Sequence, residues 1–341
     1  MTGLAERAAG YRPAIQREMR EAVGSRPDGL YAWMRYHLGW EDQAGQPVEA
    51  SPGKLMRPVA VLLATELLGG AVAHALPAAA AIELVHNFSL LHDDVEDASE
   101  FRRGRQNLWV FAGAPQAINT ADGMFVVSRL AEYRMLAAGA SAERVLAVMR
   151  EIDDACLRLV EGQYLDMSFE TRSDVTLDEY LTMAQGKTAA LFAAPFASGA
   201  ILAGASEASV AAVREYGRHV GLAFQMVDDV LGIWGDPAVT GKPVGDDLSA
   251  RKMTYPVIVA LESSEEAGGL LREAYETRPS SNDPIEAMGR WVEATGARAA
   301  TEAKARAEMQ LAMDALTGAG LSAEALGILA EYAEAAVGRV T

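Results

Sequence analysis

Three aspartates end an otherwise apolar helical pattern. Asp93, Asp94 and Asp97 lie at the C-terminal end of a helix predicted over residues 77–97. Asp93 and Asp97 are four residues apart and therefore share a helix face. Three carboxylates this close repel one another unless a cation lies between them. Their hard oxygen atoms suit Mg²⁺, which keeps several waters and shares its other positions with phosphate oxygens.

A second acidic pair repeats the pattern. Asp228 and Asp229 follow the apolar run 220–227, and Gln225 precedes them on the same side of the helix. Each cluster alone can also be interpreted as a solvated helix end, although an acidic last turn opposes the helix dipole. Two such clusters in one chain favour a metal site, because facing acidic helices can clamp Mg²⁺ ions that hold a diphosphate.

Basic side chains accompany the acidic ones. Arg102 and Arg103 follow the first cluster and present forked donors that fit phosphate oxygens, and Gly104 permits a tight turn. Lys54 and Arg57 share one face at a predicted helix start, which is a plausible anion site. Salt bridges to neighbouring acids are the alternative interpretation of the arginines.

Four further residues are weaker candidates. Lys187, Lys242 and Lys252 are each, taken alone, more typical of a surface than of a site. His86 lies two turns before Asp93 on the same face, is neutral or charged at little cost, and can bond a phosphate. For His86 alone, a hydrogen-bonded core histidine is the simpler interpretation. Together the residues indicate two polyanion sites, one built from Mg²⁺ and aspartate, the other from lysine and arginine.

Long helices must position these side chains. Apolar residues recur at spacings of three and four through most of the chain, and strand-like alternation is scarce. Thr176 and Glu179 form a capping-box pattern at one helix start. The pattern predicts helices over 2–23, 54–68, 77–97, 115–136, 141–169, 176–202 and 206–232, and from 254 to 340 with breaks near 279–284 and 318–320. Long helices with short loops predict an all-α bundle, and the lack of a composition break predicts a single domain over residues 1–341.

Composition narrows the class of protein. The chain has 341 residues, 50% of them hydrophobic, which is enough for a packed core. Its 30 Lys and Arg against 47 Asp and Glu give a net charge of −17, which argues against nucleic acid as the main partner. Cys156 is the single cysteine, which excludes an intrachain disulfide and a cysteine-based metal cluster. Apolar stretches break well before about 18 residues and the N-terminus lacks an apolar signal core, so we expect no membrane span and a cytoplasmic location.

Taken together, these residues resemble the trans-isoprenyl diphosphate synthase family over about residues 50–260. The resemblance lies in six ordered motifs: Gly53-Lys-Leu-Met-Arg-Pro58, Asp93-Asp-Val-Glu-Asp97, Arg102-Arg-Gly104, Gly186-Lys-Thr188, Phe224-Gln-Met-Val-Asp-Asp-Val-Leu-Gly232 and Gly235-Asp-Pro-Ala-Val-Thr-Gly-Lys-Pro-Val-Gly245. It implies an isoprenoid synthase-type bundle of long antiparallel helices around a deep central cavity. It also implies about three Mg²⁺ ions per active site and a homodimer.

The resemblance assigns roles residue by residue. Mg²⁺ would be held against the allylic diphosphate by Asp93, Asp94, Asp97, Asp228 and Asp229. The same diphosphate would be contacted by Arg102, Lys187, Lys242 and Lys252. Isopentenyl diphosphate would be bound by Lys54, Arg57, His86 and Arg103. The allylic side, near the developing cation, would be supported by Thr188 and Gln225.

The implied activity is Mg²⁺-dependent head-to-tail transfer of a prenyl group from an allylic diphosphate to isopentenyl diphosphate. Residues five and four before the first aspartate usually form part of the pocket floor in this family. Here they are Phe88 and Ser89, a large and a small side chain that favour a C15–C20 product, geranylgeranyl diphosphate foremost. The alternative floor lies around Met124 and Phe125. Two other functions stay open: a class I terpene cyclase on the same fold, and a non-catalytic partner subunit of a heteromeric synthase.

The chain departs from the family pattern in its second aspartate motif. Gly232 stands where an aspartate is common, so one carboxylate is missing. Asp246 and Asp247 are near enough in sequence to suggest that one of them compensates. A paired basic site further along is reduced to Lys252-Met253.

Overall fold

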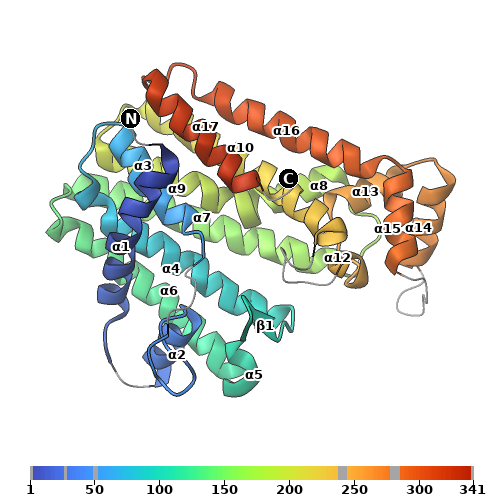
Figure 1. Cartoon of the computed structure of the whole chain (residues 1–341), viewed down its shortest axis with the longest axis horizontal. Helices are drawn as coiled ribbons and strands as arrows, with labels where there is room; N and C mark the ends of the chain where they lie inside the picture. The colour runs from blue at the N-terminus through green and yellow to red at the C-terminus, as the bar shows by residue number, and fades with distance from the viewer. Residues whose placement is uncertain (1–2, 27–28, 49–52, 237–243, 277–284, 339–341) are drawn as a thin grey trace. The chain divides into compact units, whose positions relative to one another are not determined.

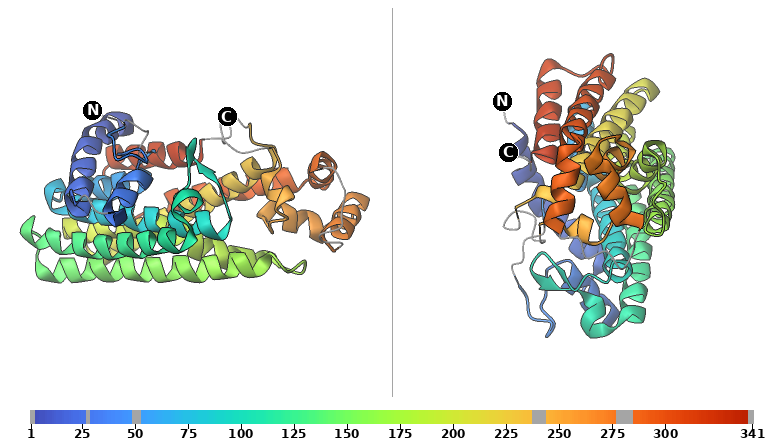
Figure 2. Two further views of the ribbon diagram at one scale, coloured as in Figure 1. Left: turned by 90° about the horizontal axis from the view of Figure 1, so that it is seen from below. Right: turned by 90° about the vertical axis from the view of Figure 1, so that its right-hand side faces the viewer.

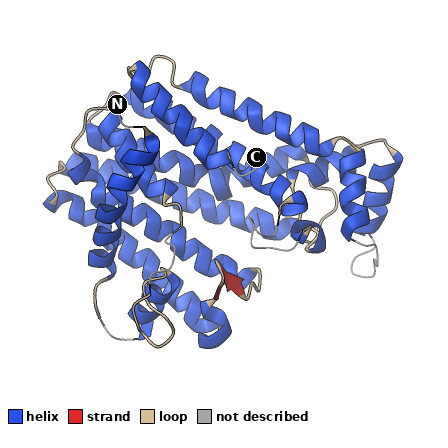
Figure 3. Ribbon diagram, viewed as in Figure 1, coloured by secondary structure: helices blue, strands red, loops and turns tan. Residues whose placement is uncertain are grey.

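The structure is a computed structural model that describes residues 3–26, 29–48, 53–236, 244–276 and 285–338. Nearly all of its regular structure is helical, and Figure 3 shows one small strand pair among the helices. That pair consists of β1 (Phe101–Arg102) and β2 (Arg105–Gln106), which run antiparallel. The prediction of an all-α fold is confirmed.

Contacts divide the chain into two compact units, which are described separately. Unit 1 comprises Met1–Asp154, Ala194–Val213 and Gly318–Ile328, and unit 2 comprises Ala155–Ala193, Arg214–Thr317 and Leu329–Thr341. Four helices contain residues of both units: α7 (Ala142–Phe169), α9 (Ala190–Ala203), α10 (Glu207–Trp234) and α17 (Ala323–Val337). The interpretation of residues 1–341 as one domain stays a prediction.

Unit 1 is organised around α4 (Val72–Glu96). This helix runs along α6 (Ala114–Ala137), and α1 (Leu4–Val23) crosses both, as Figure 1 shows. α3 (Met56–Leu67) packs on α4, while α2 (Gly29–His37) and α5 (Leu108–Ala112) pack on α6.

The apolar faces of α3 and α4 explain why these two helices are central. Residues 60–63 of α3 and 78–82 of α4 are completely buried. A helix that is apolar around most of its circumference is stable only inside a protein. The C-terminal end of α4, where its polar residues begin, is therefore held by a rigid apolar layer.

Unit 2 contains a series of shorter helices. They are α8 (Leu177–Ala184), the π-helical turn η1 (Gln185–Ala189), α12 (Asp246–Ser249), α13 (Tyr255–Glu262), α14 (Glu266–Glu276), α15 (Ile285–Ala294) and α16 (Ala297–Ala315). α14 and α15 lie side by side, drawn in orange in Figure 2. Tyr180, Val257, Ile258 and Tyr275 belong to one buried apolar cluster in this unit.

The helix predicted over 176–202 is divided by the π-helical turn. Its start is confirmed, because the Thr176 side chain accepts from the Glu179 N–H and the Glu179 carboxylate accepts from the Thr176 N–H at 2.9 Å. π-Helical turns recur at functional sites because they displace side chains from the regular helical register. This one contains Lys187 and Thr188, both of which the sequence marks as site candidates.

Other helix boundaries differ from the predicted ones. The predicted start at residue 77 is wrong: α4 begins at Val72 and continues through Pro77, just as α1 continues through Pro13. Each proline lacks a backbone N–H and therefore removes one helical hydrogen bond. Burial of the apolar residues of both helices compensates for that loss. The pattern missed α2, α5 and α12, which have nine, five and four residues and are too short to show a period.

One stretch of the described residues is apolar and long enough to cross a membrane, judged by length and composition alone. It is Leu177–Ala203, and 83% of its most apolar window is buried inside the structure. That burial is typical of a core helix in a folded protein.

Candidate active site

The first aspartate set lies at the C-terminal end of α4 in unit 1. Asp93 is half-buried, Asp94 is 2% exposed, and Asp97 is the exposed C-cap residue. The helix ends because the chain turns at Ala98, whose φ of 49° is left-handed. The three carboxylates therefore lie at different depths, with Asp94 the most enclosed.

Arg102 binds Asp94 and leaves one of its oxygens unused. Arg102 Nε donates to Asp94 Oδ1 at 2.8 Å. Asp94 Oδ2 is buried and has no hydrogen-bond partner among the residues described. Burial raises the pKa of the Asp94 carboxyl, and the charge of Arg102 lowers it. Because buried polar atoms in native proteins are nearly always satisfied, this oxygen marks a place that a cation would complete.

A tight hairpin brings the arginines to this end of α4. Strands β1 and β2 pair Phe101 with Gln106 and Arg102 with Arg105. Arg103 and Gly104 between them have left-handed φ angles of 52° and 72°, as a two-residue hairpin requires. The turn predicted at Gly104 is confirmed.

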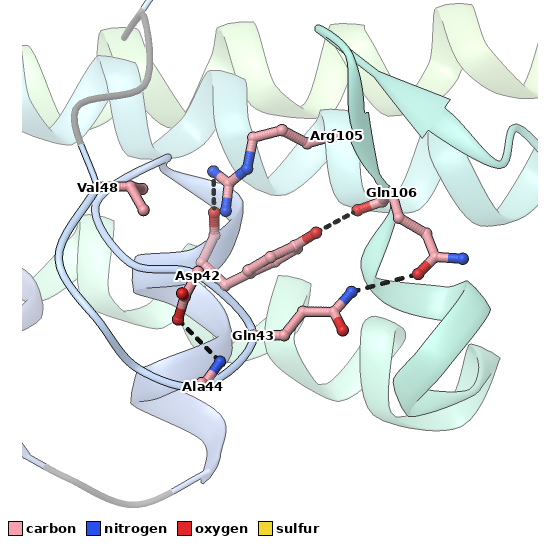
Figure 4. A pocket seen from close by; sticks show the side chains of 7 residues that line it. Asp42, Gln43, Ala44, Val48, Arg105 and Gln106 are labelled. Atoms are coloured by element: carbon pink, nitrogen blue, oxygen red, sulfur yellow. Dashed lines mark hydrogen bonds between the residues drawn. The ribbon is translucent and has the colours of Figure 1, made fainter.

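The outer side of the hairpin is anchored at a shallow pocket, which Figure 4 shows. Arg105 Nη1 donates to the Tyr36 carbonyl at 2.8 Å, and Tyr36 O–H donates to the Gln106 carbonyl at 2.7 Å. Gln43 Nε2 donates to Gln106 Oε1 at 3.2 Å. These hydrogen bonds join the hairpin to α2 and to the segment that follows it. None of the predicted site residues lines this pocket.

The other hairpin arginine lies against Gly53. A Cβ at Gly53 would come within 3.0 Å of Arg103 Nη2, and the Gly53 φ of 77° also disfavours any side chain. Lys54 follows and is exposed, and Arg57 lies in the first turn of α3. The charges of Arg57 and Arg103 both lower the pKa of Glu83 and the pKa of His86, so the two guanidinium groups lie near the same residues. Unit 1 therefore brings the predicted basic residues to one place.

His86 lies beside this basic set. Burial lowers the pKa of His86 well below its ordinary value, and the charges of Arg57 and Arg103 lower it further. The sequence leaves His86 neutral or charged, and its lowered pKa favours the neutral form. Burial is the largest cause, and the two guanidinium groups add to it.

A buried carboxyl among the arginines was missed by the sequence analysis. Glu83 is 4% exposed and accepts a 3.2 Å hydrogen bond from Asn87 Nδ2. Burial raises the pKa of Glu83 to about 7, while Arg57 and Arg103 lower it. The available signal was a single acidic residue within the apolar run 78–85.

The second aspartate pair belongs to α10 in unit 2, and its two members differ. Asp228 is exposed, whereas Asp229 is 3% exposed. Asp229 Oδ2 accepts from Tyr180 O–H at 2.6 Å and from Tyr255 N–H at 2.9 Å. Its Oδ1 accepts from Gln225 Nε2 at 2.8 Å. Burial raises the pKa of Asp229 to about 7, and these donors oppose the rise.

The π-helical turn η1 connects to this pair through hydrogen bonds within unit 2. Thr188 O–H donates to Gln225 Oε1 at 2.5 Å, so Thr188, Gln225 and Asp229 form one series. The Lys187 ammonium is paired with the carboxylate of Asp166. Asp166 and Tyr180 were not among the predicted site residues, because nothing in their local sequence indicates these partners.

Asp247 occupies the space that a side chain at position 232 would need. A Cβ on Gly232 would overlap the Asp247 carboxylate, so an aspartate there would have to displace it. The negative charge of Asp247 also contributes to raising the pKa of Asp229. Of the two suggested substitutes for the missing carboxylate, the structure therefore favours Asp247 over Asp246.

Two of the predicted lysines lie further along the chain. The Lys252 N–H donates to the Asp247 carbonyl at 2.9 Å, which holds the backbone of Lys252 next to that of Asp247. Lys242 lies outside the described residues.

The comparisons with known proteins identify the family. The family model described as Polyprenyl synthetase matches residues 40–291. The chain belongs to this family. A (2E,6E)-farnesyl diphosphate synthase of Mycobacterium tuberculosis strain H37Rv is 42% identical over 290 residues, which are 84% of this chain and 79% of that protein.

Solved structures of other polyprenyl synthetases have the same fold. A polyprenyl synthetase from Streptomyces coelicolor A3(2) has a TM-score of 0.91 and 34% identity, covering 98% of this chain and 99% of that one. A geranylgeranyl pyrophosphate synthase from Corynebacterium glutamicum, complexed with isoprenyl diphosphate and magnesium, has a TM-score of 0.82 and 25% identity, covering 99% and 100%. The resemblance read from the motifs is confirmed, and the chain is a prenyltransferase.

The two alternatives for the pocket floor of this polyprenyl synthetase meet in the structure. The ring of Phe88 packs against that of Phe125 on α6, with centroids 5.1 Å apart. Ser89 is nearly buried and donates its hydroxyl to the His86 carbonyl at 2.9 Å. Met124 is completely buried. Phe88 and Phe125 therefore form one aromatic wall in unit 1.

The donors of this polyprenyl synthetase fit Mg²⁺, provided that the ion brings other ligands. Within the part of the chain that the structure describes, no three His, Cys, Asp or Glu side chains gather closely enough to hold a metal ion alone. Mg²⁺ commonly takes one or two carboxylates and completes its shell with phosphate oxygens and water. The unsatisfied Oδ2 of Asp94 and the exposed Asp97 and Asp228 suit that kind of site.

Proposed function

We propose that this polyprenyl synthetase condenses isopentenyl diphosphate with an allylic diphosphate, head to tail and with Mg²⁺, to give geranylgeranyl diphosphate. The observation that carries the proposal is that Arg57 and Arg103 lie near the same buried residues of unit 1, with Arg103 against Gly53 and Lys54 next to Gly53 in the chain. A diphosphate there is neutralised by side chains, whereas a diphosphate beside aspartates needs a metal ion. Two diphosphates bound in two different ways are what a condensation requires.

The electrostatics of the basic set suit a diphosphate that binds without metal. Arg57 and Arg103 offer forked donors to phosphate oxygens. The neutral His86 ring adds a hydrogen-bonding group without further positive charge. Glu83 lies buried beside the two guanidinium groups and balances part of their charge before a ligand arrives.

In the proposed reaction the allylic C–O bond breaks and its electron pair leaves with pyrophosphate. The double bond of isopentenyl diphosphate attacks the allylic carbon, and the proton lost from the resulting cation passes to pyrophosphate. When bound at the aspartates, Mg²⁺ would supply charge that stabilises the leaving group. Arg102, held by Asp94 in unit 1, and Lys187, held by Asp166 in unit 2, are the cations that the resemblance assigns to the allylic diphosphate. No side-chain base is needed.

We propose the aromatic wall of Phe88 and Phe125 as the limit on product length. The farnesyl and geranylgeranyl names of the relatives leave C15 and C20 open. Phe88→Ala should shift products to C25 and beyond, because it removes one ring of the wall, whereas Phe101→Ala, at a 64% exposed ring, should not. Chromatography of the dephosphorylated products measures the shift. An unchanged spectrum for Phe88→Ala would assign the floor elsewhere.

We also propose that the enzyme acts as a homodimer. In unit 1, α6 exposes an apolar stripe at helical spacing, formed by Ile118, Val126, Leu130 and Tyr133. In unit 2, α7 exposes a second stripe, formed by Leu157, Val160, Tyr164 and Met167. Contiguous exposed apolar surface of this kind favours a protein partner, and a second copy of the chain is the partner that the family resemblance implies.

The dimer proposal is tested by charge placed in the stripe. Leu130→Glu should lower the mass measured by light scattering from two chains to one. Leu311→Glu, a matched change at an exposed leucine of α16, should leave the mass unchanged. A wild-type chain that is monomeric at micromolar concentration would remove the proposal.

The experiment that tests the function separates the two diphosphates. Calorimetric titration in EDTA should show isopentenyl diphosphate binding to the wild type and not to a Lys54→Ala, Arg103→Ala double variant. Farnesyl diphosphate should bind only after Mg²⁺ is added. A terpene cyclase needs no isopentenyl diphosphate, so absence of this metal-free binding would favour the cyclase. Binding of neither ligand would favour a non-catalytic subunit.

A further inference from the structure

Asp229 is enclosed by donors from three elements of unit 2. Tyr180, completely buried in α8, donates its O–H to Asp229 Oδ2 at 2.6 Å. The N–H of Tyr255, the first residue of α13, donates to the same oxygen at 2.9 Å. Gln225, one turn earlier on α10, donates Nε2 to Oδ1 at 2.8 Å.

These hydrogen bonds use most of the acceptor capacity of the carboxylate. Each carboxylate oxygen has about two lone-pair directions, and both of those on Oδ2 are taken. A magnesium ligand must present an oxygen that neighbouring donors do not already occupy. Asp229 does not meet this requirement, whereas its neighbour Asp228 is exposed.

The same hydrogen bonds fix the orientation of Gln225, a side chain that the family resemblance assigns to the allylic side of the site. The Gln225 amide must turn Nε2 toward the acceptor Asp229 and Oε1 toward the donor Thr188, whose hydroxyl is 2.5 Å away. Rotating the amide by half a turn would place its NH₂ against the Thr188 hydroxyl and its oxygen against a carboxylate. Asp229 therefore determines that the Gln225 amide turns its NH₂ toward the carboxylate and its oxygen toward Thr188.

The Tyr255 bond extends this arrangement to a helix start. The first N–H groups of a helix have no partner within the helix, and a carboxylate at that end is favoured by the helix dipole. Asp229 thus joins α10 to the first turn of α13, to α8 through Tyr180, and to η1 through Gln225.

We propose that Asp229 is an internal anchor that Tyr180 positions, while Asp228 keeps the metal-binding role that the motif assigns to it. This inference rests on the proposed function, since it concerns the same site. It changes the role that the motif assigns to Asp229 and gives Tyr180 a role that the motif does not contain. Tyr180 acts on the reaction through Asp229 and Gln225 and does not itself touch the substrate.

The first test measures metal binding without turnover. Mg²⁺ is titrated by calorimetry into enzyme that has been saturated with inorganic pyrophosphate. Asp228→Asn should weaken Mg²⁺ binding at least tenfold and leave the melting temperature unchanged. Asp229→Asn should leave Mg²⁺ binding within twofold and lower the melting temperature by several degrees. Equal weakening by both variants, with no loss of melting temperature for Asp229→Asn, would overturn the proposal.

The second test uses a substitution that keeps the shape of the side chain. Tyr180→Phe should lower kcat about tenfold with little change in the KM for either diphosphate. The matched control is Tyr216→Phe, which removes another fully buried hydroxyl, one that donates to the Leu329 carbonyl at 2.6 Å. Tyr216→Phe should lower the melting temperature about as much as Tyr180→Phe does, and it should leave kcat within twofold of the wild type. An equal loss of kcat in the two variants would reduce Tyr180 to a structural role.

Coupling to Thr188 distinguishes positioning from general loosening. If Tyr180 acts through Asp229 and Gln225, then adding Thr188→Val to Tyr180→Phe should lower kcat no further than about twofold. Additive losses would contradict the proposal. A wild-type enzyme that forms no prenyl product would remove the proposed function, while the difference between Asp228→Asn and Asp229→Asn in Mg²⁺ and pyrophosphate binding would still decide the anchor.

Discussion

The two aspartate pairs of this polyprenyl synthetase share one local pattern and differ in what surrounds the second aspartate. In unit 1, Asp94 binds one charged group, Arg102, through Oδ1 and keeps Oδ2 without a partner among the described residues. In unit 2, Asp229 binds uncharged donors through both oxygens. Both residues are at most 3% exposed. The two aspartates are therefore equally buried, but Asp94 keeps one oxygen that accepts no hydrogen bond from a described residue, whereas both oxygens of Asp229 accept one.

The comparison shows that an aspartate pair in a motif does not define two metal ligands. What decides is the number of donors that the surrounding helices supply. Arg102 comes from a short hairpin and provides a charge, which opposes the rise in the pKa of Asp94 that burial causes. Tyr180 and Gln225 provide fixed dipoles, which orient Asp229 and occupy it. Three predictions, in order of expected effect, test this difference.

The largest effect is expected at Asp94. Asp94→Asn replaces the open carboxylate oxygen and weakens the bond to Arg102, so kcat/KM should fall about 10³-fold, or about 4 kcal/mol. Glu132→Gln is the control. Glu132 is also completely buried, accepts from Arg129 through Oε2 at 2.5 Å, and leaves Oε1 without a partner in the described part of the chain. Steady-state kinetics should show less than a twofold change for this variant.

A similar loss in the two variants would mean that burial beside an arginine, and not the metal site, explains the effect of Asp94. Recovery of Asp94→Asn at high Mg²⁺ concentration would agree with the open-acceptor interpretation, because a weakened site fills by mass action.

An intermediate effect is expected where unit 1 binds the second diphosphate. Gly53→Ala would force the Arg103 guanidinium to move, because the new Cβ would lie 3.0 Å from Nη2. The KM for isopentenyl diphosphate should rise about tenfold, with the KM for the allylic substrate unchanged. Gly24→Ala carries the same backbone strain, at a φ of 75°, with no neighbour within 4 Å in the described part of the chain. It should change stability by about 1 kcal/mol and neither KM. Equal changes in both KM values for Gly53→Ala would contradict a separate site.

The smallest effect is expected at Gly232. Gly232→Ala would displace the Asp247 carboxylate from α10, and activity at limiting Mg²⁺ should fall about fivefold if that carboxylate replaces the missing one. In an Asp247→Ala background the same change should have no further effect, because the overlap is gone. A fivefold loss in both backgrounds would show that position 232 acts independently of Asp247.

Much of the fold could be predicted from the sequence, whereas the roles given to the site residues stay predictions. Long apolar periods predicted the large helices, and the motifs marked Lys54, Arg57, Arg102 and Arg103 as phosphate-binding candidates. Short elements could not be predicted in this way. One of them, the hairpin between Arg102 and Arg105, directs Arg102 to Asp94 and Arg105 to the Tyr36 carbonyl. Gly104 was the one local signal for it.

The difference between Asp94 and Asp229 could not be read from the sequence. Tyr180 is 49 residues before Asp229, and Tyr255 is 26 residues after it. Only packing of α8 and α13 on α10 makes them neighbours. The same holds for the lowered pKa of His86, which depends on burial and on arginines from two other segments. The choice of Asp247 over Asp246 likewise depended on the space that Gly232 leaves.

Product analysis is the most direct measurement of the central claim. Purified enzyme is incubated with Mg²⁺, labelled isopentenyl diphosphate and farnesyl diphosphate, and the labelled products are separated by chain length. We predict a labelled C20 diphosphate that forms only when both substrates and Mg²⁺ are present. A hydrocarbon formed from farnesyl diphosphate alone, or no labelled product with any allylic diphosphate, would contradict the account.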